Sequence, residues 1–243
     1  GKLVVLFDSN DIQLDGKVSL AYSEQHKHKF EAMGWQYIKV EDGNDLNLIQ
    51  RAIKKAKAEV SKPSIIEVKT VIGYGTSLAG TSKVHGAAIG SAEADIMRKT
   101  LDWPYEPFMI PEEVYAIYRK KVTLRGQRVH RRWKHLLQEY SQAYPQEFAL
   151  YEAFIKNEPV VNLDDFKEEI SGTNEATRSV SGKVLNKLSA QNLNFIGGSA
   201  DLTASTKAKG ADGNYDKDDR LSRNINFGVR EHAMVAIGNG MTL

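Results

Sequence analysis

Short apolar segments alternate with helical patterns in the first part of the chain, and this alternation restricts the possible folds more than any other feature. We expect strands at Leu3–Phe7, Trp35–Val40 and Ser64–Lys69 and helices at Glu24–Met33 and Asn44–Val60. The order strand, helix, strand, helix, strand is typical of a parallel α/β sheet with right-handed crossovers. Ligands bind beyond the carboxyl ends of the strands in such sheets. The loops that follow the first and third strands are therefore the first places to look for a site.

The helix expected at Asn44–Val60 is amphipathic. Its apolar side chains recur at the spacing of one helix face and are Leu46, Ile49, Ile53 and Val60. This periodicity predicts an α-helix with one buried face made of these four residues.

The α/β pattern returns near the end of the chain. We expect helices at Glu175–Leu188 and Val229–Asn239 and short strands at Asn194–Ile196 and Ile225–Phe227, with a turn at the glycine pair 197–198. Between the two α/β parts, Pro111–Tyr144 and Pro145–Lys156 read as long, charged helices. We therefore expect three parts: residues 1–110, a helical connector at 111–172, and residues 173–243.

The connector carries a basic cluster that consists of Lys120, Lys121, Arg125, Arg128, Arg131, Arg132 and Lys134. Such a cluster can bind nucleic acid or can be the solvated face of a helix. No recognition motif or set of interleaved aromatic residues accompanies it, which favours the solvated face. The net charge of the whole chain is only +2, so we expect no nucleic-acid partner.

The chain contains no cysteine. This excludes disulfides, thiolate metal sites and a cysteine nucleophile, and it suits a reducing compartment. No apolar run approaches the roughly 20 residues that a membrane span needs, and the first residues have no signal-peptide pattern. We therefore expect a cytoplasmic protein without a membrane partner. Because the sequence begins inside an expected strand and stops directly after an expected helix, we also expect a fragment.

Two loops follow the first and third expected strands. Asn10, in the loop Asp8–Gly16, can cap a turn or, with a nearby main-chain carbonyl, offer oxygen ligands to Mg²⁺ or Ca²⁺; a turn is the more frequent use. The loop Thr70–Gly90 is rich in glycine and contains His85, which is consistent with phosphate binding. A flexible loop with a surface histidine explains the same residues equally well.

Two further motifs lie in the last part of the chain. Gly-Gly-Ser-Ala-Asp-Leu at 197–202 precedes Ser205, and Arg178 lies upstream. Serine and arginine can bind a sugar phosphate, or they can serve as a helix cap and a surface charge. Glu231 falls in the first turn of an expected helix, where an acid commonly stabilises the helix dipole.

Together and in this order, the four motifs resemble those of the transketolase family. Gly-Gly-Ser-Ala-Asp-Leu at 197–202 and Phe-Gly-Val-Arg-Glu-His-Ala-Met at 227–234 carry most of the resemblance, which extends through essentially the whole chain, connector included. It implies two parallel-sheet domains of the thiamine-diphosphate-binding type, both incomplete here. Residues 1–110 would be the end of the diphosphate-binding domain and residues 173–243 the start of the pyrimidine-binding domain.

The resemblance also implies residue roles near the cofactor diphosphate. The side chain of Asn10 and the carbonyl of Ile12 match ligands of a divalent metal, Mg²⁺ or Ca²⁺. Leu14 matches an apolar residue that packs near the cofactor rings. His85 matches a histidine near the diphosphate, the substrate and the reacting carbon, and is thus a candidate catalytic residue.

The remaining roles that the resemblance implies fall in the last part of the chain. Glu231 matches the catalytic glutamate that hydrogen-bonds N1′ of the cofactor's aminopyrimidine and so favours the tautomer that generates the thiazolium carbanion. Asp201 matches an acid near the cofactor. Arg178 and Ser205 match residues that hold the substrate phosphate.

A transketolase moves a two-carbon ketol group from a ketose phosphate, such as xylulose 5-phosphate, to an aldose phosphate, such as ribose 5-phosphate, in the pentose phosphate pathway. The resemblance implies this activity and a homodimer with active sites shared between subunits. Because other parts of the family's active site are missing from this sequence, we expect the fragment alone to be poorly active or inactive. Two positions depart from the family pattern: Ser9 replaces the first residue of an Asn-Asn pair, and Val84 replaces a serine before His85. The alternatives are a dihydroxyacetone synthase-like ketol transferase and a non-catalytic module with the same fold.

Overall fold

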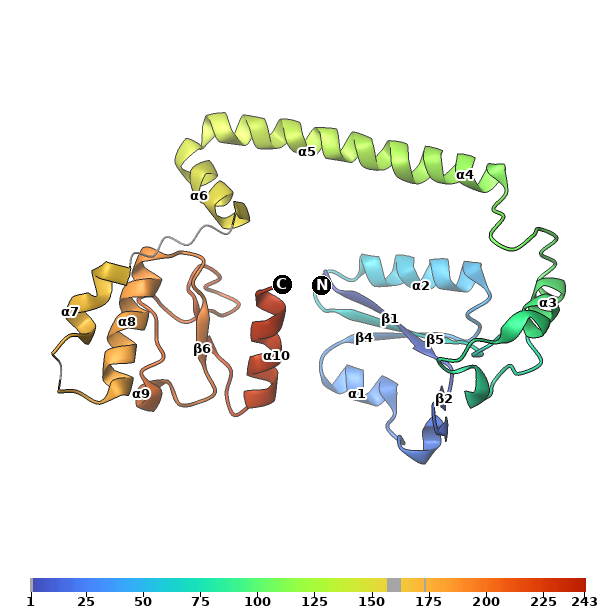
Figure 1. Cartoon of the computed structure of the whole chain (residues 1–243), viewed down its shortest axis with the longest axis horizontal. Coiled ribbons are helices and arrows are strands. Elements are labelled where there is room, and N and C mark those ends of the chain that lie inside the picture. The colour runs from blue at the N-terminus through green and yellow to red at the C-terminus, as the bar shows by residue number, and fades with distance from the viewer. Residues whose placement is uncertain (1, 157–162, 173) are drawn as a thin grey trace. The chain divides into compact units, whose positions relative to one another are not determined.

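The computed structural model describes residues 2–156, 163–172 and 174–243. The chain divides into two compact units, Gly1–Ala116 and Ile117–Leu243, each of which is considered by itself (Figure 1).

The first unit is built on a parallel three-stranded sheet. Its strands are β1 (Val4–Ser9), β4 (Gln36–Val40) and β5 (Ser64–Lys69), in the spatial order β1-β5-β4. Ile65 of the central strand is in register with Val5 on one side and Tyr37 on the other. Helices α1 (His26–Ala32) and α2 (Leu46–Ala58) lie on opposite sides of this sheet in Figure 1. The predicted parallel α/β sheet is confirmed.

The core of this unit lies between α2 and the sheet. Its buried members are Ile38, Val40, Ala52, Ala56, Ile66 and Val68, with Leu48, Ile49, Ile53 and Val4 packed around them. The prediction that Leu46 and Val60 belong to this buried face is wrong, because their exposed fractions are 77% and 84%. The side chain of Asp45 accepts hydrogen bonds from the backbone N–H groups of the second and third helical residues, so the helix begins only at Leu46. It ends at Ala58, which leaves Val60 outside it.

Shorter elements complete the first unit. They are the hairpin strands β2 (Ile12–Gln13) and β3 (Gly16–Lys17), the short helices η1 (Val18–Leu20) and η2 (Ser82–Val84), and the helices α3 (Gly90–Thr100) and α4 (Glu112–Tyr118). Both β2 and β3 lie within the loop that follows β1.

The second unit contains the expected connector helices and a small parallel sheet. The helices of its first part are η3 (Arg119–Thr123), α5 (Leu124–Ala143), α6 (Pro145–Lys156), η4 (Leu163–Phe166) and α7 (Lys167–Ile170). The α/β part follows with α8 (Thr177–Gln191), β6 (Gly197–Ser199), α9 (Thr203–Thr206), β7 (Asn224–Asn226) and α10 (Glu231–Met241). In the described part of the chain, no helix is both long and apolar enough to cross a membrane.

The strand predicted at Asn194–Ile196 lies three residues further on, at the glycine pair that the sequence pattern assigned to a turn. Gly198 pairs in parallel with Ile225 of β7. A Cβ atom at position 198 would lie 1.8 Å from the carbonyl oxygen of Ile225, so only glycine allows the two strands to come this close.

Replacing Gly198 with alanine should therefore destabilise the second unit. We expect a loss of about 1–3 kcal/mol or more in unfolding free energy, because the strands must separate to admit the methyl group. Urea unfolding of the protein that carries this chain measures the loss. Gly197→Ala is the matched control, because a Cβ at that position has no neighbour within 4 Å in the described structure. Equal unfolding free energies for the two variants would contradict the prediction.

Candidate active site

The carboxyl ends of β1 and β5 lie side by side at one edge of the first sheet. Ser9, the last residue of β1, is in register with Lys69, the last residue of β5. The backbone N–H of Thr70 donates to the carbonyl of Ser9 over 3.3 Å, and the hydroxyl of Thr70 donates to the carboxylate of Asp8. The loop with Asn10 and the glycine-rich loop therefore leave the sheet from adjacent positions.

A tight turn follows β1 and contains both predicted metal ligands. The backbone N–H of Ile12 donates to Oδ1 of Asn10 over 3.0 Å. Asp11, between them, has a left-handed backbone with φ of 62°, and its carbonyl accepts from the N–H of Val18 over 2.9 Å. Because a carbonyl oxygen has two lone pairs, Oδ1 of Asn10 can still accept a further bond.

Lys69 joins this turn to the neighbouring strand. Its Nζ lies 2.7 Å from Oδ2 of Asp11 and donates to Oγ of Ser9 over 3.2 Å. Neither member of this ion pair is among the residues predicted from the sequence pattern. No sequence signal links them, since the contact depends on the register between β1 and β5.

A buried carboxylate lies beneath the turn. Glu67 of β5 accepts hydrogen bonds from Oγ of Ser9 over 2.8 Å and from Oη of Tyr37 over 2.6 Å, and Nδ1 of His26 lies 3.3 Å away. Burial alone would raise the pKa of Glu67, but the hydrogen bonds from its three partners outweigh burial and place the pKa below its ordinary value. Burial and then the Glu67 carboxylate raise the pKa of Tyr37. Glu67 is thus a fixed anion that anchors Ser9.

A cavity of about 670 Å³ lies beside β1 and the turn. Asn10, Asp11 and Ile12 line it, together with residues of α1 and β1. Leu14 does not line it, and its side chain is 71% exposed. Of the three predicted cofactor residues in the loop after β1, Asn10 and Ile12 therefore line one cavity, whereas Leu14 stays at the surface of the hairpin.

His85 follows η2 in the glycine-rich loop after β5. Its backbone N–H donates to the carbonyl of Ser82 over 3.0 Å. Its Nδ1 is buried and has no hydrogen-bond partner among the described residues. Val84 packs on Gly73, where an added Cβ would lie only 2.9 Å from the valine side chain. The residue before His85 thus holds the loop by apolar contact, and Nδ1 of His85 is a buried nitrogen without a partner among the described residues.

Asp201 and Glu231 follow the carboxyl ends of the two parallel strands of the second unit. The backbone N–H of Phe227, directly after β7, donates to the carbonyl of Ser199 over 3.2 Å. Asp201 is exposed and has a left-handed φ of 63°. Glu231 is the first residue of α10 and is also exposed. Both acids therefore belong to the edge where parallel sheets bind ligands.

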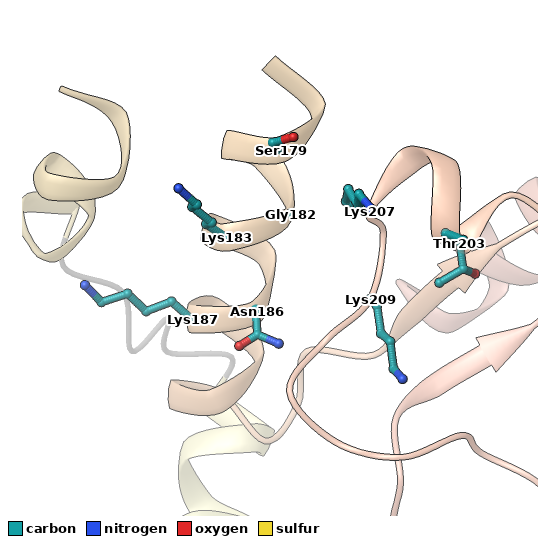
Figure 2. Close-up of a pocket in the computed structure, with 9 residues that line it drawn as sticks. Ser179, Gly182, Lys183, Asn186, Lys187, Thr203, Lys207 and Lys209 are labelled. Atoms are coloured by element: carbon teal, nitrogen blue, oxygen red, sulfur yellow. The ribbon is translucent and has the colours of Figure 1, made fainter. Parts of the chain in front are cut away.

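Arg178 and Ser205 are both exposed, in the first turn of α8 and within α9. Their sequence neighbours Ser179 and Ala204 line an open groove of about 910 Å³ between α8 and the segment that ends at Lys209 (Figure 2). Four lysines also line this groove: Lys183, Lys187, Lys207 and Lys209. Arg178 and Ser205 themselves do not line it, so the groove does not unite the two predicted phosphate-binding side chains.

Comparisons with known proteins agree with one family over the whole chain. Residues 1–159 match the family model "Transketolase, thiamine diphosphate binding domain", and residues 174–243 match "Transketolase, pyrimidine binding domain". A probable transketolase of Streptococcus pneumoniae is 47% identical over 247 residues, and the transketolase of Geobacillus stearothermophilus is 44% identical over 252 residues. Both alignments cover 100% of this chain and 37% of the relative, so the chain spans little more than a third of these relatives' length.

Solved structures agree. The transketolase from Leishmania mexicana matches with a TM-score of 0.88 and 35% identity, over 99% of this chain and 36% of that one. A transketolase from Pichia stipitis in complex with sedoheptulose 7-phosphate matches with a TM-score of 0.88 and 31% identity, over 98% of this chain and 37% of that one.

Proposed function

The chain belongs to the transketolase family, and on this premise we propose that the protein carrying it transfers a two-carbon ketol unit from a ketose phosphate to an aldose phosphate. Thiamine diphosphate is the proposed cofactor, which the matched thiamine diphosphate binding domain supports. We further propose that the protein is a cytoplasmic homodimer.

One observation carries the proposal furthest. Glu231 is exposed at the start of α10, the helix that follows β7 after a short loop, and no ion pair within the described ranges neutralises it. Its carboxylate can accept a hydrogen bond from the N1′–H group of an aminopyrimidine in its protonated or imino form. If Glu231 served only to stabilise the helix, no ring nitrogen would have to lie opposite its carboxylate.

The residues after β1 fit one side of a divalent cation site. Asn10 offers an amide oxygen with a free lone pair, and Ile12 offers a main-chain carbonyl. Within the described residues no group of three or more His, Cys, Asp or Glu side chains could hold a metal alone. Two neutral oxygens suit Mg²⁺ or Ca²⁺ only when other oxygens, such as those of a diphosphate, complete the coordination. This donor set therefore fits a cation shared with the cofactor.

His85 and Arg178 suit the anionic parts of the ligands. The buried, unsatisfied Nδ1 of His85 fits a hydrogen bond to a phosphate or substrate oxygen. We propose that Arg178 and Ser205 hold the substrate phosphate, and that Asp201 and Leu14 lie near the cofactor. When bound, thiamine diphosphate supplies the nucleophilic carbon, and these side chains bind and orient the reacting molecules.

The activity itself is testable with the protein that carries this chain. Xylulose 5-phosphate and ribose 5-phosphate serve as donor and acceptor, with thiamine diphosphate and Mg²⁺ present. Formation of sedoheptulose 7-phosphate supports the proposal. Transfer to formaldehyde in place of ribose 5-phosphate would instead indicate a dihydroxyacetone synthase.

Asn10→Ala should weaken cofactor binding that depends on a divalent metal, because one oxygen ligand is lost. Calorimetric titration of thiamine diphosphate with and without Mg²⁺ measures this effect. We expect the variant to lose most of the gain in affinity that Mg²⁺ confers on the unmodified protein. The same affinity as the unmodified protein in both conditions would refute the role of Asn10.

A further inference from the structure

We propose that Asp11 and Lys69 form a brace that holds the Asn10–Ile12 turn in the shape needed for cation binding. This inference rests on the cation site proposed above and assigns two positioning residues to it. Neither side chain is a proposed ligand. Asp11 belongs to the turn after β1, and Lys69 is the last residue of the adjacent strand β5.

Asp11 lies between the two proposed ligands, so its backbone decides where both oxygens point. Its φ of 62° is in the left-handed region, which aspartate adopts more readily than most residues but which still needs contacts to fix it. Two contacts do so. The carbonyl accepts from the N–H of Val18 over 2.9 Å, and the carboxylate accepts from Nζ of Lys69 over 2.7 Å.

Lys69 is itself well fixed. Its side chain is only 27% exposed, and its Nζ also donates to Oγ of Ser9. The same hydroxyl donates to the buried carboxylate of Glu67 over 2.8 Å. The chain of contacts therefore runs from a buried anion in the central strand, through Ser9 and Lys69, to the residue between the ligands.

Charge also favours this assignment. If the ammonium group of Lys69 were unpaired beside the proposed ligands, it would repel a divalent cation. The carboxylate of Asp11 neutralises it, while it leaves the neutral oxygens of Asn10 and Ile12 as donors. The brace thus fixes the turn without placing net charge beside the cation.

The test measures the affinity for Mn²⁺ of the protein that carries this chain. Electron paramagnetic resonance detects Mn²⁺ binding, and thiamine diphosphate is present throughout. Lys69→Met and Asp11→Asn should each weaken Mn²⁺ binding about 10–100-fold, the usual effect of losing a partner outside the coordination shell. The double variant should be no weaker than the single variants, because both remove the same ion pair. Lys69→Arg should retain most of the affinity.

Two further measurements separate positioning from general stability. A high Mn²⁺ concentration should restore cofactor binding in Lys69→Met, and its thermal midpoint should match that of Lys39→Met. The latter variant removes a comparable ion pair of the same sheet, in which Nζ of Lys39 lies 2.9 Å from Oε1 of Glu41, and it should bind Mn²⁺ normally.

The contrary outcomes are distinct. If Lys69→Met weakens binding and Asp11→Asn does not, Lys69 acts directly on an anionic ligand and the brace is wrong. If neither variant weakens binding although Asn10→Ala does, the brace is wrong and the cation site stands. If Asn10→Ala also leaves Mn²⁺ binding unchanged, the cation site itself is wrong and the brace fails with it.

Discussion

Replacing Glu231 with glutamine is expected to lower turnover by about 10²–10⁴-fold, the range associated with one positioned acid–base group. Glutamine keeps the shape of the side chain and can still meet a ring nitrogen, but it lacks the negative charge that favours the reactive tautomer. The fold should survive, because Glu231 is exposed at the first position of α10. As a helix-dipole residue it would contribute only about 0.3–1 kcal/mol.

The measurement is kcat at saturating thiamine diphosphate, with the thermal midpoint recorded alongside. Glu113→Gln is the matched control, since Glu113 is also an exposed glutamate in the first turn of a helix. If Glu231 served only the helix dipole, both variants would keep near-normal turnover and lose similar, small amounts of stability. That result would return Glu231 to a structural role.

Mixing Asn10→Ala protein with Glu231→Gln protein is expected to restore up to about a quarter of the unmodified activity. The two residues belong to different compact units of the chain, and the family resemblance implies that one cofactor is bound by Asn10 of one subunit and Glu231 of the other. In a mixed dimer of this kind, one site carries both lesions and the other carries none. Random exchange makes half of the dimers mixed, and each has one intact site of two, which yields the quarter.

Each variant alone, taken through the same exchange procedure, is the control and should remain nearly inactive. Subunit exchange must be followed independently, for example with two different affinity tags. If exchange is complete and activity stays at the level of the single variants, each site lies within one chain and the shared site is excluded.

Local pattern was enough to predict the elements of the fold but not their exact ends or their closest contacts. The alternation in residues 3–69 predicted the parallel sheet, because strands and helices have different apolar periods. Leu46 was assigned wrongly because the capping side chain of Asp45 makes Leu46 the first residue of the helix, and its side chain stays exposed at that end. The glycine pair was assigned wrongly because its role depends on Ile225, a partner distant in sequence.

The candidate site likewise contains residues that local sequence pattern could place and contacts that it could not predict. Asn10 could be placed in the loop after the first strand, and Glu231 in the first turn of a helix, because local apolar patterns mark those elements. The ion pair of Asp11 with Lys69 could not be predicted, since it requires the register in which Ser9 lies opposite Lys69. Contacts of this kind depend on three-dimensional pairing that no local pattern contains.

The position of β1 at the edge of the first sheet affects how the chain behaves when it is produced by itself. Within the described residues, β1 pairs only with β5, so its outer row of backbone N–H and C=O groups has no strand beside it. The segment Val4–Ser9 is largely apolar and contains no proline or lysine that would block strand addition. We therefore expect chains of these 243 residues to pair through this edge as their concentration rises, which size-exclusion chromatography over a range of concentrations would detect.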